Sequence, residues 1–306
     1  MARLLAPIQG RLVRRGGRLT TPYGHDLESP FWAGAEIGFL ESREAAGEAA
    51  GEAAAETLRR GWILGVHYPL VQAHAWDWAP FWLAPQSPVR QEARRTAQRA
   101  MVQAKELGAS YILFHYPWPA LVDRAVPYES LGWKIPPTAQ EERLWPRERL
   151  AGLSEEIFAE LEAVSRELRL RVVLELDGPN RVWFDPDPER DLCAALFTAH
   201  GGLDLCLDTG RLGLLARQHG GDPLGYTRRW LDFTRHVHLH GACWERRQNH
   251  LPPLPEHEGD GDYTPAVAIA RLVLRAHPET LTVLETDPRG RSAEEAERSM
   301  RYCAGL

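Results

Sequence analysis

Short apolar segments recur along this chain at the spacing of a repeating strand–helix unit, and several of them end in a side chain that binds metals. The segments are ILGVHYP with His67, YILFHYP with His115, VVLELD with Glu175, DLCLDTG with Asp208, HVHLHG with His238 and His240, and TVLETD with Glu285. When parallel strands close into a barrel, their carboxyl ends meet at one rim. The pattern therefore predicts a mixed histidine and carboxylate metal centre.

The same periodicity predicts eight strands separated by helices. Strands are expected at residues 3–8, 35–40, 62–67, 109–115, 171–176, 203–208, 236–240 and 281–286. Helices are expected at 43–60, 88–107, 154–168, 189–200, 223–233 and 264–277, and the stretch 11–34 is expected to be mostly loop. The strands are β-branched or leucine-rich, as in strands buried on both faces. We therefore expect an α/β fold, a single (β/α)8 TIM barrel over residues 1–306.

Local signals mark some helix ends. Ser154 before two glutamates and the pair Thr264-Pro265 are typical of helix starts, and Gly108 is typical of a helix end.

Three connections, 68–87, 116–153 and 241–263, are too long to be simple turns, and each follows a strand. In a barrel, such strand-to-helix loops gather on the catalytic face. They and the other strand-to-helix connections carry many tryptophans: Trp76, Trp78, Trp82, Trp118, Trp133, Trp145, Trp183 and Trp244. Two interpretations stay open. The rings anchor the loops by packing, or they line a wide cleft for a sugar or a large planar ligand.

Composition bears on the classes of partner. The formal net charge is -6 and the pI about 6.1, so no duplex nucleic acid partner is expected, because such binders usually carry a basic surface. No apolar run reaches the roughly 18 residues of a membrane span, and Pro7 and Gly10 interrupt the start too early for a signal peptide. The four cysteines form no C-x-x-C pair. We expect a reduced, cytoplasmic protein; its oligomeric state stays open.

The order of these side chains resembles the xylose isomerase-like TIM-barrel superfamily, which includes sugar isomerases and epimerases, inosose dehydratases and metal-dependent apurinic-site endonucleases. The resemblance extends from about residue 35 to 287 through VHYP, FHYP, LELD, LDTG, VHLHG and LETD. It implies that the shared metal ligands are Glu175, Asp208, His238 and Glu285. Carboxylate and imidazole ligands suit a divalent Zn, Mn, Co or Mg ion. His236, lower on the same strand, is interpreted as a structural histidine.

His67 and His115 separate the branches of that superfamily. In the endonuclease branch, histidines at these strand ends bind additional ions beside a bridging glutamate, which is Glu175 here. Two adjacent ions activate water and stabilise the leaving oxygen of a phosphoester, so the pair favours phosphoester hydrolysis. The departure from the superfamily pattern at Arg211 leaves one or two ions as the expected number, rather than three. Alternatively, either histidine binds a substrate hydroxyl.

The chain departs from the superfamily's D-T-x-H pattern at Asp208-Thr209-Gly210-Arg211. Arg211 stays protonated and cannot bind a metal, so it is expected either to clamp a phosphate or carboxylate or to pair with a barrel carboxylate. His240 and His250 are additional metal-ligand candidates, with His257 a further loop histidine within reach. Asp177 and Asp287 are interpreted as turn residues.

The leading hypothesis is a metal-dependent phosphoester hydrolase that acts on a small molecule other than DNA. Glu175, Glu285 and Arg211 would be catalytic. The tryptophan-rich loops and the arginine look like the cobamide-remodelling phosphodiesterases, which cut the nucleotide-loop phosphodiester of cobamides. The alternative is a sugar or cyclitol isomerase or epimerase in which Glu175 and Glu285 move a proton at carbon. A third hypothesis is a binding barrel that keeps its metal for structure.

Overall fold

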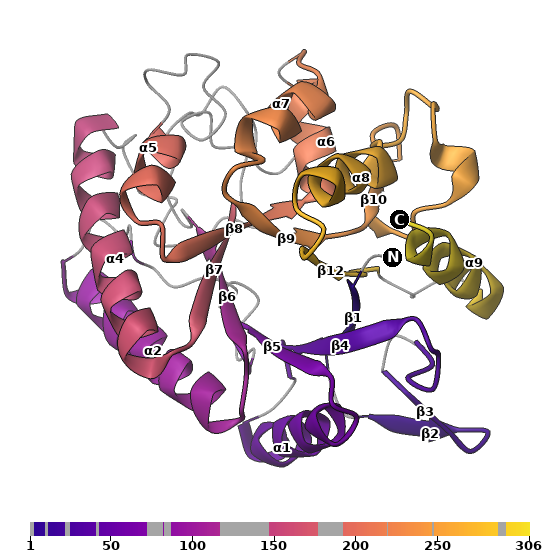
Figure 1. Cartoon of the computed structure of the whole chain (residues 1–306), viewed down its shortest axis with the longest axis horizontal. Coiled ribbons are helices and arrows are strands. Elements are labelled where there is room, and N and C mark those ends of the chain that lie inside the picture. The colour runs from indigo at the N-terminus through magenta and orange to yellow at the C-terminus, as the bar shows by residue number, and fades with distance from the viewer. Residues whose placement is uncertain are drawn as a thin grey trace.

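Eight parallel strands close into a barrel in the computed structural model of this chain (Figure 1). The structure describes residues 3–9, 12–21, 25–40, 43–71, 82, 87–116, 147–176, 192–218, 220–246, 248–286 and 292–306. Around the barrel the strands follow the order β1 (Arg3–Ile8), β12 (Leu281–Val283), β9 (Thr234–His238), β8 (Leu203–Asp208), β7 (Arg171–Leu176), β6 (Tyr111–Tyr116), β5 (Ile63–His67) and β4 (Trp32–Ile37). The predicted (β/α)8 TIM barrel is confirmed, and each strand overlaps its predicted range.

Helices surround the strands, as Figure 1 shows. Those described are α1 (Arg43–Arg59), α2 (Ser87–Glu106), α4 (Arg147–Leu168), α5 (Leu192–Ala199), α6 (Thr209–Gln218), α7 (Pro223–Trp230), α8 (Ala266–Ala276) and α9 (Ala293–Ala304), with a 3-10 turn, η3 (Pro255–His257). The predicted end of α2 at Gly108 is confirmed by the positive φ of that residue, 82°, and α8 begins directly after Pro265.

Three local predictions were wrong or incomplete. Ser154 does not start a helix, because α4 already begins at Arg147; Ser154 is buried inside it and its hydroxyl accepts a hydrogen bond from Tyr116. The helices α6 and α9 were not predicted. The stretch 11–34 contains the hairpin of β2 (Val13–Arg15) and β3 (Arg18–Thr20), whose turn uses two glycines with positive φ, and is therefore less of a loop than expected.

Alternation along the strands divides their side chains between two cores. The larger core, between strands and helices, receives Ile112 and Phe114 of β6. The smaller core fills the barrel interior with Leu5, Tyr111, Leu113, Val173, Cys206, Leu281 and Val283. Because side chains two residues apart share a face, His115 and Glu175 point to the same interior, one step nearer the carboxyl rim. The fold therefore directs the polar side chains of His115 and Glu175 into the apolar interior of the barrel.

The long strand-to-helix connections fall largely outside the described residues. Trp82 is buried against Phe114 and Tyr116 under the helices, so this tryptophan is a packing anchor. A second hairpin follows β9, formed by β10 (Gly241–Cys243) and β11 (Gln248–Leu251). The other tryptophans of these loops except Trp244, together with Asp177 and Asp287, lie outside the described part of the chain. Among the described residues, no helix combines the length and the apolar character that a bilayer crossing requires.

His25 links the packing of the N-terminal region to acid stability. Its buried ring lies edge-on to Trp32, with the ring centroids 5.5 Å apart. Burial lowers the pKa of His25 from 6.5 to about 4, because the imidazolium would lose its hydration. Between these values the unfolded chain binds a proton that the folded chain does not. Stability is therefore full above the unfolded pKa and is lost as pH falls toward the folded one, by about 1.4 kcal/mol per pH unit.

We expect a His25→Phe variant to lose less stability than the wild-type protein when the pH is lowered from about 7.5 to about 4.5. The free energy of unfolding, measured by urea titration at several pH values, checks this. The same pH dependence in both proteins would contradict it.

Candidate metal centre

The carboxyl ends of the barrel strands bring buried ionisable side chains together. They are Glu36 on β4, His67 on β5, His115 on β6, Glu175 on β7, Asp208 on β8, His238 on β9, and Glu285 just beyond β12. The sheet register places His115 beside Glu175 and Asp208 beside His238. The sequence-predicted candidates from the strands therefore lie in one buried group, reached from one rim.

Glu175, His238 and Glu285 form the centre of this group. His238 Nδ1 lies 2.9 Å from Glu175 Oε2 and 3.1 Å from Glu285 Oε2. Within the described residues, none of these three atoms has a partner with hydrogen-bond geometry. Buried polar atoms without partners are costly, and carboxylate and imidazole atoms of this kind suit a divalent ion. Glu175 and His238 form, together with Cys206, one of the groups whose atoms are close enough to hold an ion. Burial alone would raise the pKa of Glu285, but the neighbouring His238 lowers it well below the usual value.

Asp208 is engaged differently from the other predicted ligands. Its Oδ1 accepts a hydrogen bond from the Arg211 backbone N–H at 2.8 Å and lies 2.8 Å from His240 Nε2. Its Oδ2 lies 3.2 Å from Arg211 Nε. Burial alone would raise the pKa of Asp208, but His240 and Arg211 outweigh burial and lower it. Gly210 permits this arrangement, because a Cβ there would lie 2.2 Å from the His240 ring.

Arg211 projects from the first turn of α6 into the same group. Its Nη1 donates to Glu175 Oε1 at 2.8 Å and lies 3.2 Å from His115 Nδ1. The guanidinium therefore pairs with barrel carboxylates, which is one of the two roles expected from the sequence.

His67 and His115 lie side by side next to Glu175. Their Nε2 atoms are 3.2 Å apart, and each is 3.8 Å from Glu175 Oε2. His67 Nδ1 lies 2.8 Å from the Tyr68 carbonyl oxygen. Burial, assisted by His115, lowers the pKa of His67 to about 4, so its ring is neutral at neutral pH. These two rings and Glu175 form a second group whose atoms are close enough to hold an ion.

The remaining histidines occupy different places. His250 stacks on His240 with ring centroids 4.2 Å apart, and together with Glu285 they form a further potential ligand group. His257 instead stacks on Tyr263 at 3.9 Å. His236 packs against Tyr111 lower in the barrel, in the structural position that the sequence suggested.

Glu36 is a site residue that the sequence reasoning missed. Its Oε1 lies 3.2 Å from His238 Nε2, and its Oε2 accepts a hydrogen bond from the Tyr111 hydroxyl at 2.7 Å. The Tyr111 ring reaches Glu36 because it crosses Gly65, where a Cβ would lie 2.1 Å from the ring. A glutamate inside the apolar strand segment WAGAEI was the available signal. Glu36 therefore faces one nitrogen of His238 while the other nitrogen faces Glu175 and Glu285.

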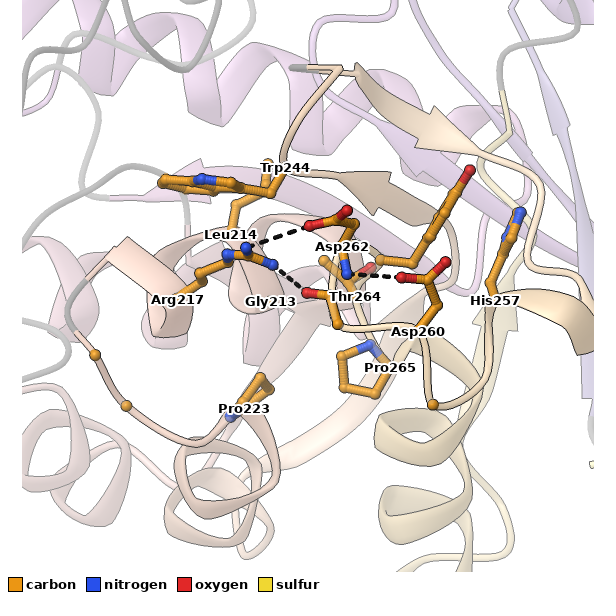
Figure 2. Close-up of a pocket in the computed structure, with 15 residues that line it drawn as sticks. Gly213, Leu214, Arg217, Pro223, Trp244, His257, Asp260, Asp262, Thr264 and Pro265 are labelled. Carbon is orange, nitrogen blue, oxygen red and sulfur yellow. Dashed lines mark hydrogen bonds and ion pairs between the residues drawn. The ribbon is translucent and has the colours of Figure 1, made fainter.

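A cavity of about 480 Å³ opens on the outer side of α6 (Figure 2). Arg217, one and a half turns beyond Arg211, points into it and pairs with Asp262 at 3.3 Å, with its guanidinium 5.5 Å from the Trp244 ring centroid. Trp244 thus borders a cavity, but one separate from the strand-end residues, so the interpretation of the tryptophans as the lining of a substrate cleft stays a prediction. The residues that line the cavity include His257 but none of the strand-end ligands.

Comparisons with known proteins agree with the architecture. Residues 32–304 match the family model described as xylose isomerase-like TIM barrel. The fold is similar to that of 3-keto-D-glucoside 4-epimerase YcjR from E. coli, with 13% identity, coverage of 100% of both chains and a TM-score of 0.61. It is also similar to that of a D-tagatose 3-epimerase-like protein, with 13% identity, coverage of 90% of both chains and a TM-score of 0.56.

A third similar structure is a xylose isomerase-like TIM barrel protein from Mycobacterium smegmatis in complex with magnesium. It shares 14% identity over 99% of this chain and 97% of that one, with a TM-score of 0.55. At these identities the structures establish a shared fold. No curated protein matches the chain in sequence.

We expect Glu36→Gln to weaken divalent-metal binding by about 10-fold or more, because carboxylates that orient a metal-binding histidine typically contribute that much. Isothermal titration with Mn²⁺ measures this. Asp204→Asn is the matched control, since Asp204 pairs with Arg171 at the other end of the barrel. Equal affinities in Glu36→Gln and wild type would remove Glu36 from the centre.

Proposed function

Since this chain belongs to the xylose isomerase-like TIM barrel family, we propose that it is a metal-dependent isomerase or epimerase of a sugar or cyclitol. The observation that carries the proposal is the placement of two carboxylates, Glu175 and Glu285, each with one oxygen within about 3 Å of His238 Nδ1. Two structures with a similar fold are a sugar epimerase and an epimerase-like protein. They support this substrate class over a phosphoester.

Glu175, His238 and Glu285 would hold a divalent ion, with Asp208 as the further ligand that the family resemblance implies. In the part of the chain that the structure describes, buried atoms of these residues lack a hydrogen-bond partner, which fits such an ion. Once bound, a divalent ion polarises a substrate carbonyl and stabilises negative charge on its oxygen. Carboxylate and imidazole ligands suit Zn, Mn, Co or Mg, and magnesium is bound in the similar M. smegmatis structure.

The two glutamates would carry out the proton transfer. Glu285 would act as the base, because an ionised carboxylate accepts a proton from the carbon next to a carbonyl. The electron pair of that C–H bond moves to the carbonyl oxygen. For inversion, Glu175 would have to start protonated; it would donate that proton to the opposite face of the carbon as the electron pair returns from the oxygen, and Glu285 would end protonated. Return of the proton from Glu285 to the neighbouring carbon, together with transfer of the hydroxyl proton to the former carbonyl oxygen, would instead give the isomer.

We expect metal-loaded protein in D2O to incorporate deuterium next to the carbonyl of at least one member of a ketose and keto-cyclitol panel, followed by NMR. Glu175→Gln and Glu285→Gln should each slow this exchange by about 100-fold or more, because each removes a proton-transferring group. Glu297→Gln on the exposed face of α9 is the matched control and should retain full exchange. Exchange that survives in both site variants would contradict the proposed roles.

Phosphoester hydrolysis remains a second candidate because of one observation, the group of His67, His115 and Glu175, which is close enough to hold a second ion. The phosphate-clamping role suggested for Arg211 competes with its pairing to Glu175 and Asp208. The family and the similar structures named above give no support to the cobamide-remodelling branch.

The two candidates differ at His115. We expect no metal-dependent cleavage of bis-p-nitrophenyl phosphate, and we expect His115→Ala to reduce deuterium exchange by less than about 10-fold, since it removes no proton-transferring group. Spectrophotometric assay of nitrophenolate checks the first part. Cleavage that is lost in both Glu175→Gln and His115→Ala would favour the hydrolase instead.

A further inference from the structure

Arg211 is a permanent positive charge built into the metal-ligand group. Its side chain is buried and its guanidinium lies among three groups that come from separate strands: Glu175 at 2.8 Å, Asp208 at 3.2 Å and His115 at 3.2 Å. An arginine cannot lose its proton at physiological pH. The guanidinium therefore neutralises buried carboxylate charge within the ligand group.

The hydrogen bonds that start at Arg211 determine which nitrogens of the neighbouring histidines can accept. Arg211 has only donors, so at 3.2 Å His115 Nδ1 must be the acceptor. In the neutral ring, His115 Nε2 then carries the hydrogen and donates it to His67 Nε2, also 3.2 Å away. His67 Nδ1 in turn donates to the Tyr68 carbonyl oxygen at 2.8 Å.

This chain of hydrogen bonds uses the atoms that a second ion would need. A metal requires a lone pair on each ligand nitrogen, but the Nε2 of His115 is a donor and that of His67 is already an acceptor. The two carboxylate oxygens of Glu175 also have different neighbours. Its Oε1 accepts from Arg211, whereas its Oε2 faces His238 Nδ1 at 2.9 Å. Only the side of Glu175 that faces His238 and Glu285 keeps its lone pairs for an ion.

We propose that the Arg211 guanidinium takes the place of a second metal ion, so that each chain binds one divalent ion, on the side of Glu175, His238 and Glu285. The inference rests on the metal centre of the proposed function. It assigns His67 and His115 to the support of Arg211 rather than to metal binding. It also makes Arg211 the residue that restricts the centre to one ion.

The test is a count of ions. Protein stripped with a chelator is titrated with Mn²⁺ and with Zn²⁺ by calorimetry, and the bound metal is confirmed by elemental analysis after gel filtration. The wild-type protein should bind one ion per chain. Arg211→His and Arg211→Met should each bind two, since they free the lone pairs of His67 and His115 and leave Glu175 without its cation. Arg211→Lys keeps the charge and should bind one.

The second ion has a control of its own. Adding His115→Ala to Arg211→His should return the number of bound ions to one per chain. His67→Ala in the wild-type background should also bind one ion, and its Kd for the metal should change by less than about 3-fold, a shift of about 0.7 kcal/mol. Two ions in wild type, a single ion in both Arg211→His and Arg211→Met, or loss of the wild-type ion in His67→Ala would overturn the proposal. The His67→Ala and wild-type measurements hold even if the arginine variants fail to fold.

Failure of this proposal is distinguishable from failure of the proposed function, because ions are counted without turnover. One ion per chain without deuterium exchange on any substrate would support the role of Arg211 and contradict the proposed isomerase activity.

Discussion

Buried negative charge is the constraint on which this site depends. Glu36, Glu175, Asp208 and Glu285 are all buried at the carboxyl end of the barrel, above an interior core of mostly apolar side chains. Each ionised carboxylate removed from water costs on the order of several kcal/mol unless a cation or hydrogen-bond donor offsets it. The arrangement of partners around these four carboxylates therefore determines what the centre can bind.

The four carboxylates have different partners, and these partners distinguish three regions of the site. Glu36 lies at its floor and is held by Tyr111 and His238. Asp208 is held by Arg211 and His240 on one side. Glu175 and Glu285 each direct one oxygen toward His238. Protein cations and donors thus lie close to the floor and the side of the site, and the region between Glu175 and Glu285 is the part that an ion and a substrate would share.

The same division bears on the chemistry. Proton transfer at carbon needs two carboxylates near one substrate atom and an electrophile beside them, whereas phosphoester hydrolysis of the kind considered from the sequence needs a pair of ions. A protein cation close to Glu175 and Asp208 favours the first arrangement. The outer cavity at Arg217 and Trp244 shows that α6 contributes to two regions, because Arg211 and Arg217 project from it in different directions.

The sequence by itself determined the barrel and the strand-end residues. Eight apolar runs at regular spacing leave few alternatives to a closed parallel sheet, and a period of two fixes that His115, Glu175 and Asp208 point inward. Helix ends were less certain, as Ser154 shows, because a serine before glutamates looks the same at a helix start and in a helix interior. Only the tertiary structure decided which side chains meet. Arg211 contacts His115, 96 residues away, and Glu36 contacts Tyr111, 75 residues away. Distances across a barrel rim depend on strand register and on small residues such as Gly65 and Gly210, neither of which spacing along the chain reveals.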